Sequence, residues 1–142
     1  MIKDVLINIK GVQGIDDQSD TVELTTDGRF GIKDGQYFLS YDEGQILDSY
    51  EEIKTNIFIK SATSVVLQRS GAINSRMLIE KDMRNTCYYS TPHGDLVIGI
   101  CGEDFDIKLD ENGGEIKLKY TIDSNLQLLS RNEVNISVRE VN

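Results

Sequence analysis

Apolar and polar residues alternate along most of this chain. Side chains of a β-strand point to opposite faces in turn, so a period of two predicts strands with one buried and one solvated face. β-branched and aromatic residues, which favour strands, are frequent in the same segments. The alternation runs through residues 5–10, 22–26, 53–60, 104–109, 116–122 and 134–139. The pattern predicts an all-β protein built from antiparallel strands.

Two short hairpin turns give a separate test of this interpretation. Asn-Gly and Asp-Gly are the strongest signals for a two-residue β-hairpin loop. A loop at Asp34–Gly35 predicts the cross-strand pairs Lys33–Gln36, Ile32–Tyr37, Phe30–Leu39 and Gly28–Tyr41. A loop at Asn112–Gly113 predicts the pairs Glu111–Gly114, Leu109–Ile116, Ile107–Leu118 and Phe105–Tyr120. Both registers bring the large apolar residues onto one face, and a slip of one residue would scatter them.

Two further connections place residues on a face. A four-residue loop at Thr91–Gly94 pairs Tyr89 with Leu96 and Cys87 with Ile98, all four pointing inward, and leaves Cys101 pointing outward. A three-residue loop at Ala72–Asn74 lets Val65, Leu67 and Arg69 share a face with Met77 and Ile79. In that loop Asn74 adopts a left-handed conformation, which asparagine tolerates.

The chain of 142 residues is long enough for one domain, and no linker or repeat divides it. Consecutive amphipathic hairpins bury one face without bare edges when the sheet closes on itself. We therefore expect residues 1–142 to form a single closed or nearly closed antiparallel up-and-down β-barrel of eight to ten strands. Terminal strands near residues 2–13 and 127–140 would complete the ring. A two-layer sandwich is the alternative, but only residues 42–52, which we interpret as a loop with room for a helical turn, could form its long crossover.

Charge and composition exclude several classes of function. The net charge of −9 repels phosphate backbones, so we expect no nucleic-acid partner. No run of about 18 apolar residues occurs, so we expect no membrane span. The segment Met1–Val5 alternates and carries charge, unlike a signal peptide, and we expect a cytoplasmic protein. The sequence sets no oligomeric state.

Four segments, in this order along the chain, carry a resemblance to a known family: Ser40–Glu43, Arg69–Met77, Tyr89–Gly99 and the glycine pair Gly113–Gly114. Together they resemble the YwiB-like bacterial β-barrel proteins, a family of unknown function. The resemblance covers nearly the whole chain, and its most specific part is the Arg-Ser-Gly…Asn-Ser-Arg-Met segment of residues 69–77. It implies a cytoplasmic protein with a lipocalin-like (calycin) barrel. It implies no activity and no catalytic residue.

Arg69 is the first candidate for a binding residue. By alternation it follows Val65 and Leu67 toward the interior. A buried guanidinium needs a partner, because an isolated charge in an apolar environment is costly. Arg69 therefore either anchors a ligand carboxylate or phosphate at the barrel mouth, or forms a structural salt bridge or hydrogen bonds to carbonyl groups that close the barrel end.

Four tyrosines, Tyr37, Tyr41, Tyr89 and Tyr120, fall on positions that we expect to point inward. A tyrosine buries an apolar ring and presents a polar hydroxyl, so such residues can orient a ligand or pack a core. We select Tyr41, Tyr89 and Tyr120, with Arg69, as candidate ligand-binding residues.

Catalytic and metal-binding patterns are absent from the sequence. His93 is the only histidine and follows Pro92 in a turn, where it lacks partners for general-base catalysis. Asp16, Asp17 and Asp20 lack the spacing of a calcium loop, so we interpret them as an exposed loop between strands. We expect no metal, no cofactor and no catalytic residue.

Two functions remain. The first is a non-enzymatic module that binds an anionic, partly apolar small molecule in the barrel or at its mouth. The alternative is a protein-interaction or assembly module with a packed barrel, which acts through exposed Phe38 and Phe58 on its outer face. An enzyme of unknown class is a third and weaker hypothesis.

Overall fold

The computed structural model describes residues 2–15, 17–42, 53–71, 74–91 and 94–141, and only the backbone of residues 89–91. Ten strands form in these ranges. They are β1 (Ile2–Ile15), β2 (Gln18–Lys33), β3 (Gln36–Asp42), β4 (Ile53–Ser61), β5 (Ser64–Gly71), β6 (Asn74–Glu80), β7 (Arg84–Thr91), β8 (Gly94–Asp110), β9 (Gly113–Ser124) and β10 (Gln127–Glu140). None of the described residues belongs to a helix long and apolar enough to cross a bilayer.

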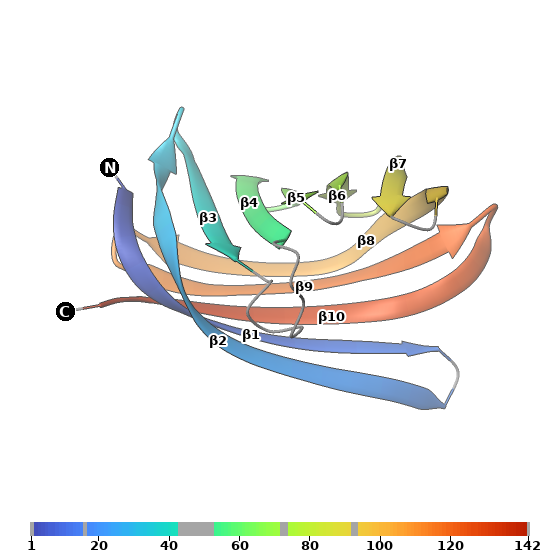
Figure 1. The fold of residues 1–142 in the computed structure, drawn as a ribbon, viewed down its shortest axis with the longest axis horizontal. Coiled ribbons are helices and arrows are strands. Elements are labelled where there is room, and N and C mark those ends of the chain that lie inside the picture. The colour runs from blue at the N-terminus through green and yellow to red at the C-terminus, as the bar shows by residue number, and fades with distance from the viewer. Residues whose placement is uncertain (1, 16, 43–52, 72–73, 92–93, 142) are drawn as a thin grey trace.

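The strands form one closed barrel in which every strand lies beside its neighbours in sequence (Figure 1). All pairs are antiparallel, and β1 pairs with β10 to close the ring. The predicted up-and-down barrel and the predicted role of the terminal strands are therefore confirmed. Closure leaves the amphipathic strands with one shared interior.

The strands fall into two groups by length. β1, β2, β8, β9 and β10 have 12 to 17 residues, whereas β3 to β7 have 7 to 9 residues. Figure 1 shows the long strands as a curved trough below the short ones. Ile2 and Glu140 lie at one end of the barrel, which we call the termini end. At the opposite end, which we call the open end, β3, β5, β7 and β9 finish.

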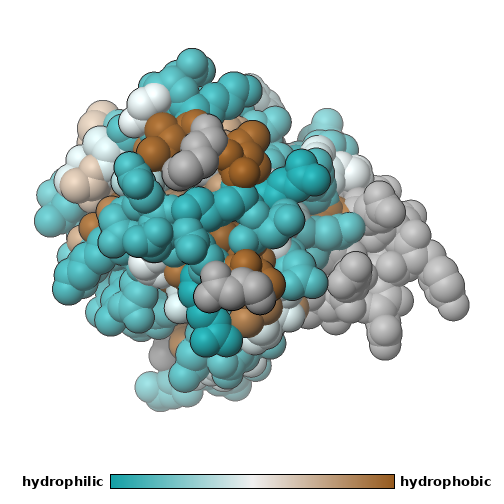
Figure 2. Space-filling model, turned by 90° about the vertical axis from the view of Figure 1, so that its left-hand side faces the viewer, coloured by the Kyte–Doolittle hydropathy of each residue, from teal (hydrophilic) through white to brown (hydrophobic). Residues whose placement is uncertain are grey.

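Large side chains fill the termini end. Val5, Phe30 and Leu39 are completely buried there, and the Phe30 and Tyr37 rings stack with centroids 5.5 Å apart. Seen from outside, this end is covered mostly by hydrophilic side chains (Figure 2). A second buried cluster, with Met77, Cys87 and Ile98 among its members, lies beneath β6, β7 and β8.

The Asp34–Gly35 hairpin has the predicted register from Lys33↔Gln36 to Gly28↔Tyr41. Asp34 and Gly35 have φ angles of 54° and 78°, the positive values that the favoured two-residue turn requires at both positions.

The predicted register of the Asn112–Gly113 hairpin is wrong by two residues. Leu109 pairs with Gly114, not with Ile116, and the loop consists of Glu111 and Asn112. The Asn112 N–H donates to Asp110 Oδ1 at 2.8 Å. Gly113 belongs to β9, where its φ of 119° and the clash of a Cβ with the Val138 carbonyl oxygen both require glycine. Because the shift is even, the apolar residues keep their face.

The other two connections are confirmed in part. Val65, Leu67 and Arg69 share the inner face with Met77 and Ile79, as predicted. Asn74, however, lies in β6 and has no positive φ. Its side chain bonds both backbone groups of Gly71, which is the residue with positive φ, 115°. Residues 72–73 and 43–52, where we expected loops, and residues 92–93 lie outside the described part of the chain.

The β7–β8 hairpin pairs Tyr89 with Leu96 and Cys87 with Ile98, as predicted. Cys87 and Ile98 are buried. Leu96 lies on the same face of β8 as the buried Ile98, as predicted, but 58% of it is exposed. It lies only two residues from the start of β8, at the open end.

Candidate functional site

A cavity of about 300 Å³ lies inside the barrel, on the side of the open end. Its walls are mostly aliphatic, with Leu24, Ile57, Val65, Leu67, Leu118 and Ile136 among the lining residues. Alternation places these side chains inward, since each of their strands has one apolar face. The volume is at the lower end of the range of small-molecule sites, about 300–1,000 Å³.

Polar residues form a row across the short strands. Tyr41 pairs with Thr55, Thr55 with Arg69, and Arg69 with Ser75, all on the inner face. Tyr41 and Arg69 line the cavity. Thr55 and Ser75 are 0% and 8% exposed, and in the described structure neither hydroxyl has a hydrogen-bond partner. We call these four residues the short-strand row.

A second polar row crosses the long strands. Gln13 pairs with Asp20 on one side and with Asn132 on the other, and Asn132 pairs with Tyr120. All four residues line the cavity. The Asn132 amide donates one N–H to Ser130 Oγ at 3.0 Å, which leaves its second N–H and its carbonyl oxygen for other partners. We call these four residues the long-strand row.

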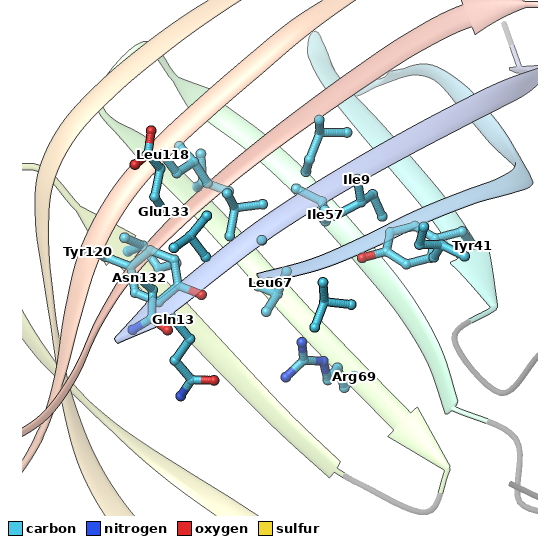
Figure 3. Close-up of a pocket in the computed structure, with 18 of the residues that line it drawn as sticks. Ile9, Gln13, Tyr41, Ile57, Leu67, Arg69, Leu118, Tyr120, Asn132 and Glu133 are labelled. Atoms are coloured by element: carbon cyan, nitrogen blue, oxygen red, sulfur yellow. The ribbon is translucent and has the colours of Figure 1, made fainter. Parts of the chain in front are cut away.

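The two rows face each other across the cavity. β5, which carries Arg69, and β10, which carries Asn132, are five steps apart in the ring of ten strands and so lie on opposite sides. Figure 3 shows Gln13, Asn132 and Tyr120 on one side of the cavity, and Arg69 and Tyr41 on the other. The site therefore combines aliphatic walls with polar groups from both halves of the barrel.

Three of the four candidate residues from the sequence line this cavity: Arg69, Tyr41 and Tyr120. The backbone of Tyr89 pairs with Ser75, but its side chain lies outside the described part. Tyr37 points inward, yet it stacks on Phe30 at the termini end and does not line the cavity. His93 is also outside the described residues.

The sequence analysis missed the long-strand row. We expected Asp20 in an exposed loop. It lies instead in a strand, because β2 begins at Gln18 and Asp20 pairs with Gln13. Asp20 is exposed, however, as expected. Continuing the alternation of Val5, Ile7 and Ile9 would have placed Gln13 inward. Its pairing with Asn132 could not be predicted in this way, because it depends on the closure of the barrel between β1 and β10.

Outside the cavity, Arg84 and Asp123 form a two-pronged ion pair on the outer face. Arg84 Nε and Nη2 donate to the Asp123 carboxylate at 3.0 and 2.6 Å. Asp123 Oδ1 also accepts from the Leu126 N–H at 3.1 Å. The hydrogen bond from Arg84 lowers the pKa of Asp123. A Cβ on Gly99 would meet the guanidinium, so Arg84 can reach over β8 only because residue 99 is glycine.

Cys87 and Cys101 are free thiols on opposite faces, as predicted. Burial raises the pKa of Cys87, which disfavours the nucleophilic thiolate. Within the described ranges, no group of three or more His, Cys, Asp or Glu side chains could hold a metal ion.

Comparisons with known proteins agree with this architecture. Residues 7–136 match the family described as "Domain of unknown function (DUF1934)". The chain is 25% identical over 116 residues to the Bacillus subtilis (strain 168) protein named "Uncharacterized beta-barrel protein YwiB", covering 82% of this chain and 79% of that protein. The crystal structure of the ywiB protein from Bacillus subtilis superposes with a TM-score of 0.87 at 21% identity, covering 99% of this chain and 94% of that one. These matches confirm the expected fold.

Proposed function

Since this chain belongs to the DUF1934 family, described as a domain of unknown function, we propose a function from the cavity itself. The resemblance to YwiB-like proteins agrees with this family. The protein is a non-enzymatic module that binds one small, anionic and partly apolar molecule. The ligand's apolar part lies among the aliphatic walls, and its anionic group lies at Arg69. Tyr41 and Tyr120 line the wall around it.

One observation carries the proposal: Arg69 is the only lysine, arginine or histidine among the described residues that line the cavity. Its side chain is half-buried beside aliphatic residues. A guanidinium presents five N–H donors and no acceptor, so it selects an anion, and a planar fork suits a carboxylate or phosphate.

The use of the barrel would be lipocalin-like, with one ligand held inside a ring of strands. The proposed binding takes place in the cytoplasm. The two cysteines, Cys87 and Cys101, are free thiols, as is usual in a reducing compartment.

Native mass spectrometry of the protein purified from its own cells is the first test. We expect a mass above that of the denatured chain, because a ligand in an apolar cavity survives gentle purification. The excess mass would begin its identification. A native mass equal to the chain mass, also after incubation with an anionic amphiphile such as dodecanoate, would overturn the proposal.

Arg69→Met separates a binding role from a structural one. Methionine keeps much of the aliphatic volume and removes the charge, so we expect stability to stay equal or rise while binding is lost. Arg76→Met is the matched control, because Arg76 is exposed on the outer face of the adjacent strand. If Arg69→Met unfolds the protein, Arg69 is structural and the proposal loses its main support.

The alternative, an interaction or assembly module, is favoured by a different observation. Phe38, Phe58, Val66 and Leu78 form an apolar row in register across the outer face of β3 to β6. The expectation that Phe38 and Phe58 are exposed is wrong, since both side chains are only partly accessible. Light scattering tests this function: Phe58→Ser should convert an oligomer into a monomer, and a wild-type monomer without a partner would exclude self-assembly.

A further inference from the structure

The two polar rows at the cavity differ in the hydrogen bonds they can offer. On the short strands, Arg69 only donates. The hydroxyls of Thr55 and Ser75, one on each side of Arg69, are buried and lack partners in the described structure. Neither hydroxyl is among the described groups that line the cavity, so the anion-binding donors of this wall are those of Arg69.

The opposite wall, unlike Arg69, includes hydrogen-bond acceptors. The Asn132 amide donates one N–H to Ser130 Oγ, and its carbonyl oxygen remains an acceptor for the cavity beside the second N–H. Asp20, in the same row, is a carboxylate and accepts only. Its negative charge also disfavours an anion on this side, so the anionic group of a ligand belongs at Arg69.

Glu133, the other acidic lining residue, does not change this polarity. It alternates with the inward-facing Asn132 and Val134 on β10. Figure 3 shows its carboxylate pointing away from the centre of the cavity. Acceptors that reach the ligand thus come from the long-strand row.

Resting on the proposed function, we infer that the ligand's head group combines an anion with a hydrogen-bond donor. The class is an aliphatic carboxylate with an amide N–H or a hydroxyl close to the carboxylate, as in an N-acyl amino acid. The carboxylate lies at Arg69 in the short-strand row, the N–H or O–H donates to Asn132 Oδ1 in the long-strand row, and the aliphatic chain fills the cavity. A simple fatty acid can bind Arg69 through its carboxylate, but it has no hydrogen-bond donor for Asn132 Oδ1.

Three probes of similar size test the inference by isothermal titration calorimetry: N-decanoylglycine, N-decanoylsarcosine and dodecanoate. All carry one carboxylate and an aliphatic chain, but only N-decanoylglycine has an N–H, which the sarcosine compound replaces with a methyl group. We expect N-decanoylglycine to bind about tenfold tighter than either of the others, the difference of one good hydrogen bond.

A variant of the acceptor completes the test. Asn132→Leu should remove the preference for N-decanoylglycine, whereas Asn56→Leu, an asparagine on the outer face of β4, should keep it. The comparison among probes on the unchanged protein does not depend on the folding of either variant. Equal binding of all three probes would overturn the inference and leave the proposed function standing. If none of the three binds, the proposed function falls as well.

Discussion

Two seams of the barrel are closed in different ways. Between β1 and β10, the two ends of the chain, ten consecutive residue pairs run from Val5↔Glu140 to Gly14↔Arg131. Between β6 and β7, which are neighbours in sequence, the ladder holds only Asn74↔Ser90 and Ser75↔Tyr89. We call these the terminal seam and the β6–β7 seam.

Side chains replace main-chain bonds along the β6–β7 seam. Asn85 Nδ2 donates to the Leu78 carbonyl oxygen and to Glu80 Oε1, each at 3.2 Å. The Cys87 thiol donates to the Arg76 carbonyl oxygen at 3.2 Å. The Arg84–Asp123 pair then links β7 to β9 across β8. Sequence neighbours are thus joined by a few specific side chains, and sequence-distant strands by a continuous ladder.

The difference between the two seams indicates that the barrel opens first between β6 and β7. A continuous ladder over a buried core opens only with the whole domain, whereas a short ladder can open locally at a lower free energy. The following predictions test whether the two seams differ in this way.

The largest effect is expected at the terminal seam. Ile7 is completely buried and packs on Gly28, so Ile7→Ala should lower the free energy of unfolding by about 4 kcal/mol. Met77→Ala, next to the β6–β7 seam and 2% exposed, should cost only about 2 kcal/mol, because a locally opening site relaxes more easily. Urea unfolding measures both. An equal or larger loss for Met77→Ala would contradict the comparison.

The Arg84–Asp123 pair should give acid-sensitive stability. Its Asp123 has a lowered pKa in the folded state, so its contribution is complete above the unfolded value, about 3.9, and is lost as the pH falls through the lower folded value. Urea midpoints between about pH 5 and pH 2 should therefore fall less in Asp123→Asn than in the wild type. Asp106→Asn, an exposed acid on the outer face of β8, is the control. If the urea midpoints of Asp123→Asn and the wild type fall by the same amount between these pH values, the ion pair does not make the stability acid-sensitive.

Asn85→Ala removes two hydrogen bonds across the β6–β7 seam. Each such bond contributes about 0.5–1.5 kcal/mol, and we expect a loss of about 1 kcal/mol. Hydrogen exchange should accelerate in residues 76–80 and remain unchanged in residues 5–14. Uniform acceleration would show that the seam opens only with the whole barrel.

The smallest effect concerns the Cys87 thiol, whose raised pKa and burial make it slow to react. In a Cys101→Ala background Cys87 is the only thiol, so the rate at which it is labelled at neutral pH reports the opening of the β6–β7 seam. We expect Asn85→Ala to increase the labelling rate several-fold, in line with the weakened seam. A rate that stays the same in both proteins would mean that these bonds do not hold the seam.

Part of the site was predictable because facing depends only on local alternation. Arg69 follows Val65 and Leu67 inward, and Tyr41 and Tyr120 follow their own strands. The Asp34–Gly35 turn was predictable for the same reason, since positive φ angles at both positions are a local property. The register after Asn112–Gly113 was not, because the glycine there accommodates the carbonyl of Val138 on another strand.

By itself, the sequence determined the strands, the inner face of each one and the inward position of Arg69. Strand period and residue charge are properties of short segments and survive any arrangement of them. Only the tertiary structure decided which inner residues meet: Asn132 lies opposite Arg69 because the ring closes through β1 and β10. It also decided that β6 and β7 are joined by Asn85 and Cys87 rather than by a ladder. The physical reason is that closing a ring fixes the tilt and offset of all strands together, which no single segment encodes.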